Sequence, residues 1–225
     1  MGEIIRKNSK SDAIIADAQT TLTQATALGG RWQELAEARL GAALALHASV
    51  EVQHKAAELM FAPLRAQVDT RNNKADKTIG KVHDIVWNEI GRPAYDAALS
   101  VIFPDGIAYY AEGNTTEQPE RMDVLAQLLQ SGIHPKLSPA TATSVAAEIT
   151  AESEALRAAL EAARKPAAQL KVLGRVRTSL AKVVHAELSK LKQLYRVEGF
   201  SEAEIHAVIP DRPTAKPTKK APPTS

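Results

Sequence analysis

Apolar residues recur at steps of three and four along most of the chain, which is the spacing of one face of an α-helix. The pattern is most regular in residues 31–68, which are rich in Ala, Leu, Glu, Gln, Arg and Lys and contain one glycine. These residue types lose little conformational freedom in a helix. The pattern predicts a long helix, and a helix of this length must bury its apolar stripe against partner helices.

The helical spacing extends to both sides of this region. Residues 11–28 predict a short amphipathic helix that ends at Gly29-Gly30, a turn signal. The polar stretch 69–80 is either a loop or a solvated part of the long helix, and residues 82–90 restore the apolar spacing. The first long helical region is therefore expected to span about 31–90.

A second long helical region is predicted for residues 139–198. Ser138 precedes a proline, and a capping residue followed by proline is typical of a helix start. Farther on, Ser201 and Glu204 have the spacing of a capping box, which predicts one last short helix.

The two long regions each contain one proline, Pro63 and Pro166, and the two prolines lie equally far from residues 91–138. Antiparallel pairing of the regions therefore places both prolines at the same level. We favour kinks over turns, because neither proline has the Gly or Asn that a tight reversal uses. The predicted fold is all-α: an elongated antiparallel helical bundle or coiled-coil-like hairpin over 11–209, with a head module at 91–138. In the alternative, both regions fold back at the prolines into a compact bundle.

Five of the nine aromatic residues fall between positions 87 and 110. The turn tripeptide Pro104-Asp105-Gly106 lies among them, so residues 101–110 are expected to form a small β-hairpin or a compact loop. An aromatic head on a polar-sided helical stem suits partner binding. The candidate partner-binding residues are Tyr95, Phe103, Tyr109 and Tyr110. The alternative is that these aromatics form the local core that closes the end of the bundle.

Four residues project from one side of the first long helix: His47, Glu51, His54 and Glu58. The Glu51-x-x-His54 spacing is used by di-iron bundle proteins, but such a site needs a second copy of the motif and the chain has none. Ion pairs across the seam are the preferred interpretation. The antiparallel register places Glu51 near Arg177 and Glu58 near Lys171. It also places His54 near Arg175 and His47 near Lys182. We therefore expect no metal site.

Charge and composition exclude some classes of chemistry. The 28 Lys and Arg residues nearly balance the 26 Asp and Glu residues, and the absence of cysteine excludes disulfides and thiolate chemistry. We find no signal peptide and no apolar run as long as a membrane span, so a cytoplasmic protein is expected.

The two ends of the chain differ from the rest. Residues 1–10 are a polar lead-in, and residues 210–225 hold five of the twelve prolines and four basic residues against one acid. Both ends are predicted to be disordered. Lys216, Lys219 and Lys220 are candidates for weak, salt-sensitive nucleic-acid binding.

The chain contains no Gly-rich phosphate loop, no nucleophile elbow and no paired metal motif. We expect a non-enzymatic structural or protein-interaction (scaffold) protein that needs no cofactor and contacts a protein partner or a second copy of itself. A nucleic-acid-associated protein that uses the basic tail is the alternative, and a ferritin-like metal-binding bundle is the third interpretation.

Overall fold

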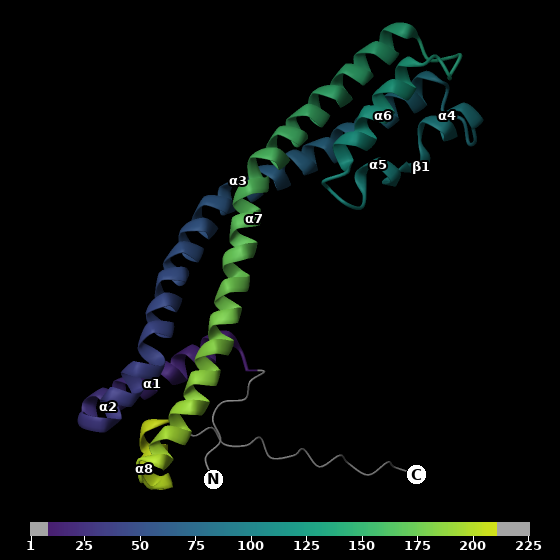
Figure 1. Ribbon diagram of the computed structural model, residues 1–225. Helices are drawn as coiled ribbons and strands as arrows, with labels where there is room; N and C mark the ends of the chain where they lie inside the picture. The colour runs from purple at the N-terminus through teal and green to yellow at the C-terminus, as the bar shows by residue number, and fades with distance from the viewer. Residues whose placement is uncertain (1–8, 211–225) are drawn as a thin grey trace, which may run out of the picture. The chain divides into compact units, whose positions relative to one another are not determined.

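The computed structural model describes residues 9–210, and almost all of this part is helical (Figure 1). In chain order the elements are α1 (Ser11–Leu28), α2 (Gly30–Ala36), the π-helical turn η1 (Glu37–Gly41), α3 (Ala42–Glu89), α4 (Ala97–Ile102), β1 (Pro104–Ile107), α5 (Ala108–Ala111), α6 (Gln118–Gln130), α7 (Pro139–Val197) and α8 (Glu202–Val208). The all-α class predicted from the spacing of apolar residues is confirmed.

The segment 101–110 forms a compact loop. Helix α4 precedes β1 and α5 follows it directly, and β1 is the one strand among residues 9–210. The two apolar arms around Pro104-Asp105-Gly106 are therefore largely helical, and of the two predicted forms the structure has the loop.

The Cα positions divide the chain into two compact units. The central unit is Ala57–Leu170, and the terminal unit combines the described residues of Met1–Ala56 and Lys171–Ser225. The predicted head module, 91–138, lies within the central unit together with the adjoining parts of α3 and α7.

Neither long helix ends at its proline. Pro63 lies inside α3 and Pro166 lies inside α7. The polar stretch 69–80 also belongs to α3. The alternative in which both regions fold back at the prolines is therefore wrong. Its physical requirement, a residue that tolerates the left-handed conformation of a tight turn, is missing at both positions.

Ion pairs within each unit follow the predicted antiparallel register. In the terminal unit, Glu51 Oε2 lies 2.6 Å from Arg177 Nε, the pair expected from the sequence. In the central unit, Lys81 Nζ lies 2.7 Å from a carboxylate oxygen of Glu148. Residues on both sides of the prolines, among them Arg65 and Ala167, line one groove of the central unit, as expected if the prolines lie at the same level.

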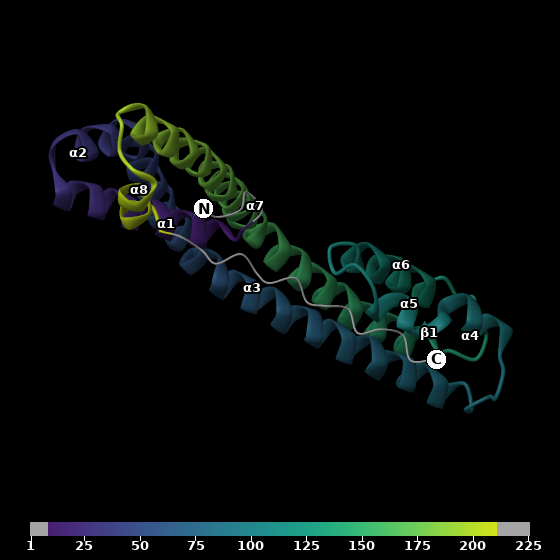
Figure 2. The ribbon, with the colours of Figure 1, turned by 90° about the horizontal axis from the view of Figure 1, so that it is seen from below.

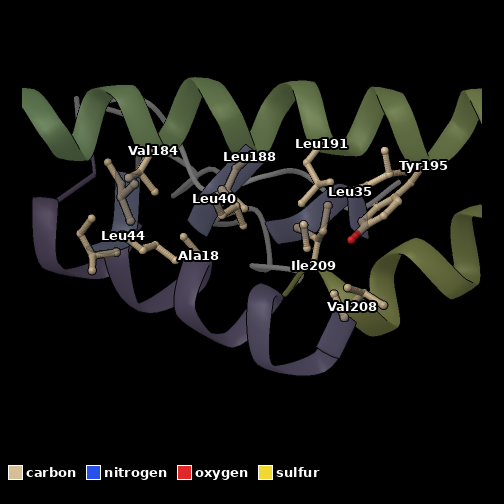
Figure 3. Packing of buried hydrophobic residues seen from close by; sticks show 14 of the residues in the cluster. Ala18, Leu35, Leu40, Leu44, Val184, Leu188, Leu191, Tyr195, Val208 and Ile209 are labelled. Atoms are coloured by element: carbon tan, nitrogen blue, oxygen red, sulfur yellow. The ribbon is translucent and has the colours of Figure 1, made fainter. Parts of the chain in front are cut away.

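The core of the terminal unit forms where α1, η1 and α8 pack on the paired ends of α3 and α7. Leu40 of η1, Leu44 of α3, and Val184 and Leu188 of α7 belong to this buried cluster, and Figure 3 shows their side chains gathered beside α7 together with Ala18 of α1. The end of α7 is closed by Tyr195, whose hydroxyl donates a hydrogen bond of 3.0 Å to the carbonyl oxygen of Trp32. The predicted capping box is present at the start of α8.

The core of the central unit forms where α6 packs on α3 and α7 (Figure 2). Met122, Leu125 and Leu129 of α6 are buried in it. Two polar contacts fix α6 along α7: Ser153 Oγ lies 2.6 Å from Asp123 Oδ1, and Arg157 Nη2 lies 2.5 Å from Asp123 Oδ2. Helix α6 therefore covers one stretch of the seam between the two long helices.

Candidate functional site

The four aromatic candidates separate into two buried and two exposed residues. Phe103 and Tyr110 are 3% and 1% exposed and belong to the core of the central unit. Tyr95 and Tyr109 are 80% and 44% exposed. The local-core interpretation therefore holds for Phe103 and Tyr110, which cannot contact a partner in this structure. Partner binding stays a prediction for Tyr95 and Tyr109.

Tyr110 fixes the loop from within. Its hydroxyl donates a hydrogen bond of 2.7 Å to the carbonyl oxygen of Ile102, which joins α5 to the end of α4. Its ring meets Phe103 edge to face at a centroid distance of 5.9 Å, and Phe103 in turn meets His83 of α3 at 4.9 Å. Burial raises the pKa of Tyr110 to about 12. The hydroxyl therefore stays protonated and keeps its donor role at neutral pH.

Arg121 of α6 holds the other end of the loop. Its Nη1 donates hydrogen bonds of 2.7 Å to the carbonyl oxygens of Tyr109 and Glu112. These carbonyls lie at the end of α5, where a short helix leaves its acceptors without partners. The backbone that carries the exposed Tyr109 ring is therefore tied to α6, whose apolar face is buried in the core of the central unit.

Asp96 caps the start of α4. Its Oδ1 accepts the backbone N–H of Leu99 at 2.8 Å and lies 3.3 Å from Nε2 of the buried His134. The hydrogen bond from Leu99, followed by the contact with His134, lowers the pKa of the Asp96 carboxyl. His134 Nδ1 accepts the N–H of Lys136 at 3.2 Å, which leaves Nε2 as the ring nitrogen that faces Asp96. Sequence reasoning missed this contact, because nothing local connects the two residues.

Four large apolar or aromatic side chains are exposed on this fixed segment, and we name them the aromatic tip: Tyr95, Val101, Ile107 and Tyr109. Their exposed fractions are 80%, 53%, 43% and 44%. The two tyrosines combine an apolar ring with a polar hydroxyl. Such side chains suit a surface that contacts water in the free protein and a partner in the complex. The aromatic tip can therefore bury area against another protein without refolding.

A groove of about 570 Å³ is the second candidate site of the central unit. It lies between α3 and α7, next to the first turn of α6. Its lining residues are Phe61, Arg65, Val68, Thr116, Pro119, Glu120, Arg157, Leu160, Glu161, Ala163, Arg164 and Ala167. The apolar members come from both long helices and the charged members are arginine and glutamate. The groove offers apolar contact and ion pairing.

Of the four residues considered for a metal site, His47, Glu51 and His54 lie on the seam of the terminal unit and Glu58 belongs to the central unit. Arg177 reaches both Glu51, at 2.6 Å, and Asp12 of α1, at 3.4 Å. His47 is buried, and His54 lies beside Gly174 on the facing helix, near the predicted Arg175. Residues 9–210 contain no group of three or more His, Cys, Asp or Glu side chains that could hold a metal ion. The ferritin-like interpretation thus lacks a ligand set in this part of the chain.

The basic-tail candidates Lys216, Lys219 and Lys220 lie outside the described residues. Within the described part, no helix has the length and apolar character needed to cross a membrane. Comparisons of the chain with protein-family models, curated proteins and solved structures found no match.

Proposed function

We propose that this chain is a non-enzymatic scaffold protein of the cytoplasm, in which coiled-coil-like helical pairs hold the aromatic tip ready for a protein partner. The observation that carries this proposal is the exposure of Tyr95, Val101, Ile107 and Tyr109 on a segment whose backbone is held by hydrogen bonds from Tyr110 and Arg121.

Fixing the segment in advance favours binding. A partner that docks on a loose loop must order the loop, and each immobilised side chain costs about 0.5–1.5 kcal/mol of binding free energy. Here Tyr110 and Arg121 have already ordered the segment between α4 and α6. Tyrosine is also enriched among the few residues that dominate binding energy at protein interfaces.

The charges next to the aromatic tip in the chain suggest the character of the partner. Asp105 precedes Ile107 by two residues, Glu112 follows Tyr109 by three and Arg92 precedes Tyr95 by three, and all three charged side chains are exposed. Complementary charge mainly adds specificity and speeds association. The proposed partner therefore presents an apolar patch with charges of both signs at its edge.

Site-specific photo-crosslinking in cells that make the protein tests this proposal. The photoreactive amino acid p-benzoylphenylalanine replaces Tyr95, and in the control it replaces Lys77, an exposed residue of α3 in the same unit. We expect a defined cross-linked protein from position 95 and none from position 77. Adding Ile107→Asp should remove the product, because a charge placed in the proposed apolar contact must be desolvated. The same products from both positions, or none from position 95, would overturn the proposal.

A further inference from the structure

The groove is the uncovered continuation of a seam that is covered elsewhere in the central unit. Along α6, the apolar faces of α3 and α7 are sealed by Met122, Leu125 and Leu129, which are 0%, 0% and 1% exposed. The cover ends at the first turn of α6, where Pro119 forms part of the groove wall.

Past that point, the seam residues are only half buried. Phe61 and Val68 of α3 and Leu160 of α7 all line the groove and keep part of their surface exposed. Met60, next to Phe61 in α3, is 67% exposed. No described residue covers this stretch as α6 covers the other, so an apolar surface suited to helix packing meets solvent.

The charged rim of the groove is balanced in sign. Arg65 and Arg164 supply two positive charges, and Glu120 and Glu161 supply two negative charges. The remaining charged lining residue, Arg157, is engaged by Asp123 at 2.5 Å, and its Nε lies 3.9 Å from Glu120 Oε1. Arg65 forms no ion pair with any described residue, and the pair of Arg164 with Glu161 is highly exposed, with side chains 77% and 72% accessible. Arg65 is therefore free for a contact outside the chain, and the exposed pairs Arg164–Glu161 and Arg157–Glu120 are weak enough to exchange partners.

We propose that a second copy of this chain covers the groove with its own groove. In a two-fold interface each residue of one copy meets a residue of the other reciprocally, so a rim that carries both signs can pair with itself. A strongly acidic or strongly basic partner would instead select a rim of one sign. The balanced rim and the continuity with the α6-covered seam both favour the second copy.

The groove alone is smaller than a standard interface, which buries about 1,600 Å² in total. The dimer is therefore weak, because even standard-size interfaces have Kd values as high as about 1 μM. The dimer forms through a surface that shares no residue with the aromatic tip. A failure of the dimer proposal would therefore leave the proposed function unaffected, and the reverse also holds.

Charge inversion of the rim in the full-length chain tests the proposal without knowledge of which residues pair. The first variant carries Arg65→Glu and Arg164→Glu, so all four rim positions are acidic. The second carries Glu120→Lys and Glu161→Lys, so all four are basic. In sedimentation equilibrium, each variant alone should dimerise at least tenfold more weakly than the wild type, because like charges face one another.

Mixing the two variants should restore a one-to-one heterodimer, because the acidic rim then meets the basic rim. Lys77→Glu, a charge reversal outside the groove, is the matched control and should dimerise like the wild type. Phe61→Asp should abolish the dimer while circular dichroism shows an unchanged helix content. A wild-type chain that stays monomeric up to about 200 μM, well above the Kd expected for a weak interface, would overturn the proposal. So would variants that dimerise like the wild type, or a mixture without heterodimer.

Discussion

Tyr110 shows how one buried hydroxyl can hold an exposed segment in place. Tyr110→Phe keeps the ring among the core residues but removes the 2.7 Å hydrogen bond to the carbonyl of Ile102. We expect the free energy of unfolding to fall by about 1–2 kcal/mol, because the carbonyl loses its donor in a dry site. Urea unfolding followed by the fluorescence of Trp87, in the same unit, measures the change.

Tyr109→Phe is the matched control, because its ring is 44% exposed and the same hydroxyl is removed. Surface substitutions of this kind change stability by less than about 0.5 kcal/mol. Equal losses in the two variants would show that the hydrogen bond of Tyr110 does not hold the loop.

The aromatic composition of residues 87–110 predicted where the distinctive segment lies, but not which rings are buried. Phe103 and Tyr109 look alike as aromatic residues within one short segment. Phe103 is buried because α3 brings His83 to its ring, a long-range contact. The contact between Asp96 and His134 could not be predicted from the sequence either, because it too joins residues far apart in the chain. A local pattern cannot reveal partners that only the tertiary fold brings together.

At the scale of elements, each of the two internal prolines lowers the stability of the long helix that contains it. Pro63 has no backbone N–H to donate to the carbonyl of Leu59, one turn earlier in α3. Because Pro63 is exposed, Pro63→Ala restores this donor without changing the core. We expect the free energy of unfolding to rise by about 1–3 kcal/mol, with part of the gain offset by the greater freedom of the unfolded chain. Urea unfolding followed by circular dichroism measures it.

Pro93→Ala is the control for this substitution, because Pro93 lies outside the helices and its carbonyl, which accepts the Trp87 indole N–H, is kept. It should give no gain. A loss of stability in Pro63→Ala would show that the packing of α3 requires a bend at this position.

The elements themselves were largely predictable from the chain. The spacing of apolar residues and the glycine turn signal predicted α1, and the Ser201 capping box predicted α8. The positions of the two prolines predicted the register in which Glu51 pairs with Arg177. The π-helical turn at Glu37–Gly41 was not predicted, because its composition is that of an ordinary helix. The groove was also missed, because periodicity identifies an apolar seam but not the point where α6 stops covering it.

At the scale of the whole molecule, the chain offers two surfaces built by different means. The aromatic tip depends on a short segment locked by single hydrogen bonds, whereas the groove depends on where one helix ends on a longer seam. The aromatic tip lies within residues 95–109, and none of these residues lines the groove. A protein that assembles with itself through one surface can therefore present the other surface twice, which strengthens binding to a multivalent partner.

This separation predicts that the two surfaces can be switched off independently. Ile107→Asp with Tyr109→Ser should abolish cross-linking from position 95 yet leave the sedimentation equilibrium of the full-length chain unchanged. Arg65→Glu with Arg164→Glu should do the opposite. Each pair serves as the control for the other, since all four side chains are partly exposed and their replacement leaves the helical core intact. If one substitution pair impaired both measurements, the partner would be binding only to the assembled dimer, and the two surfaces would form a single functional unit.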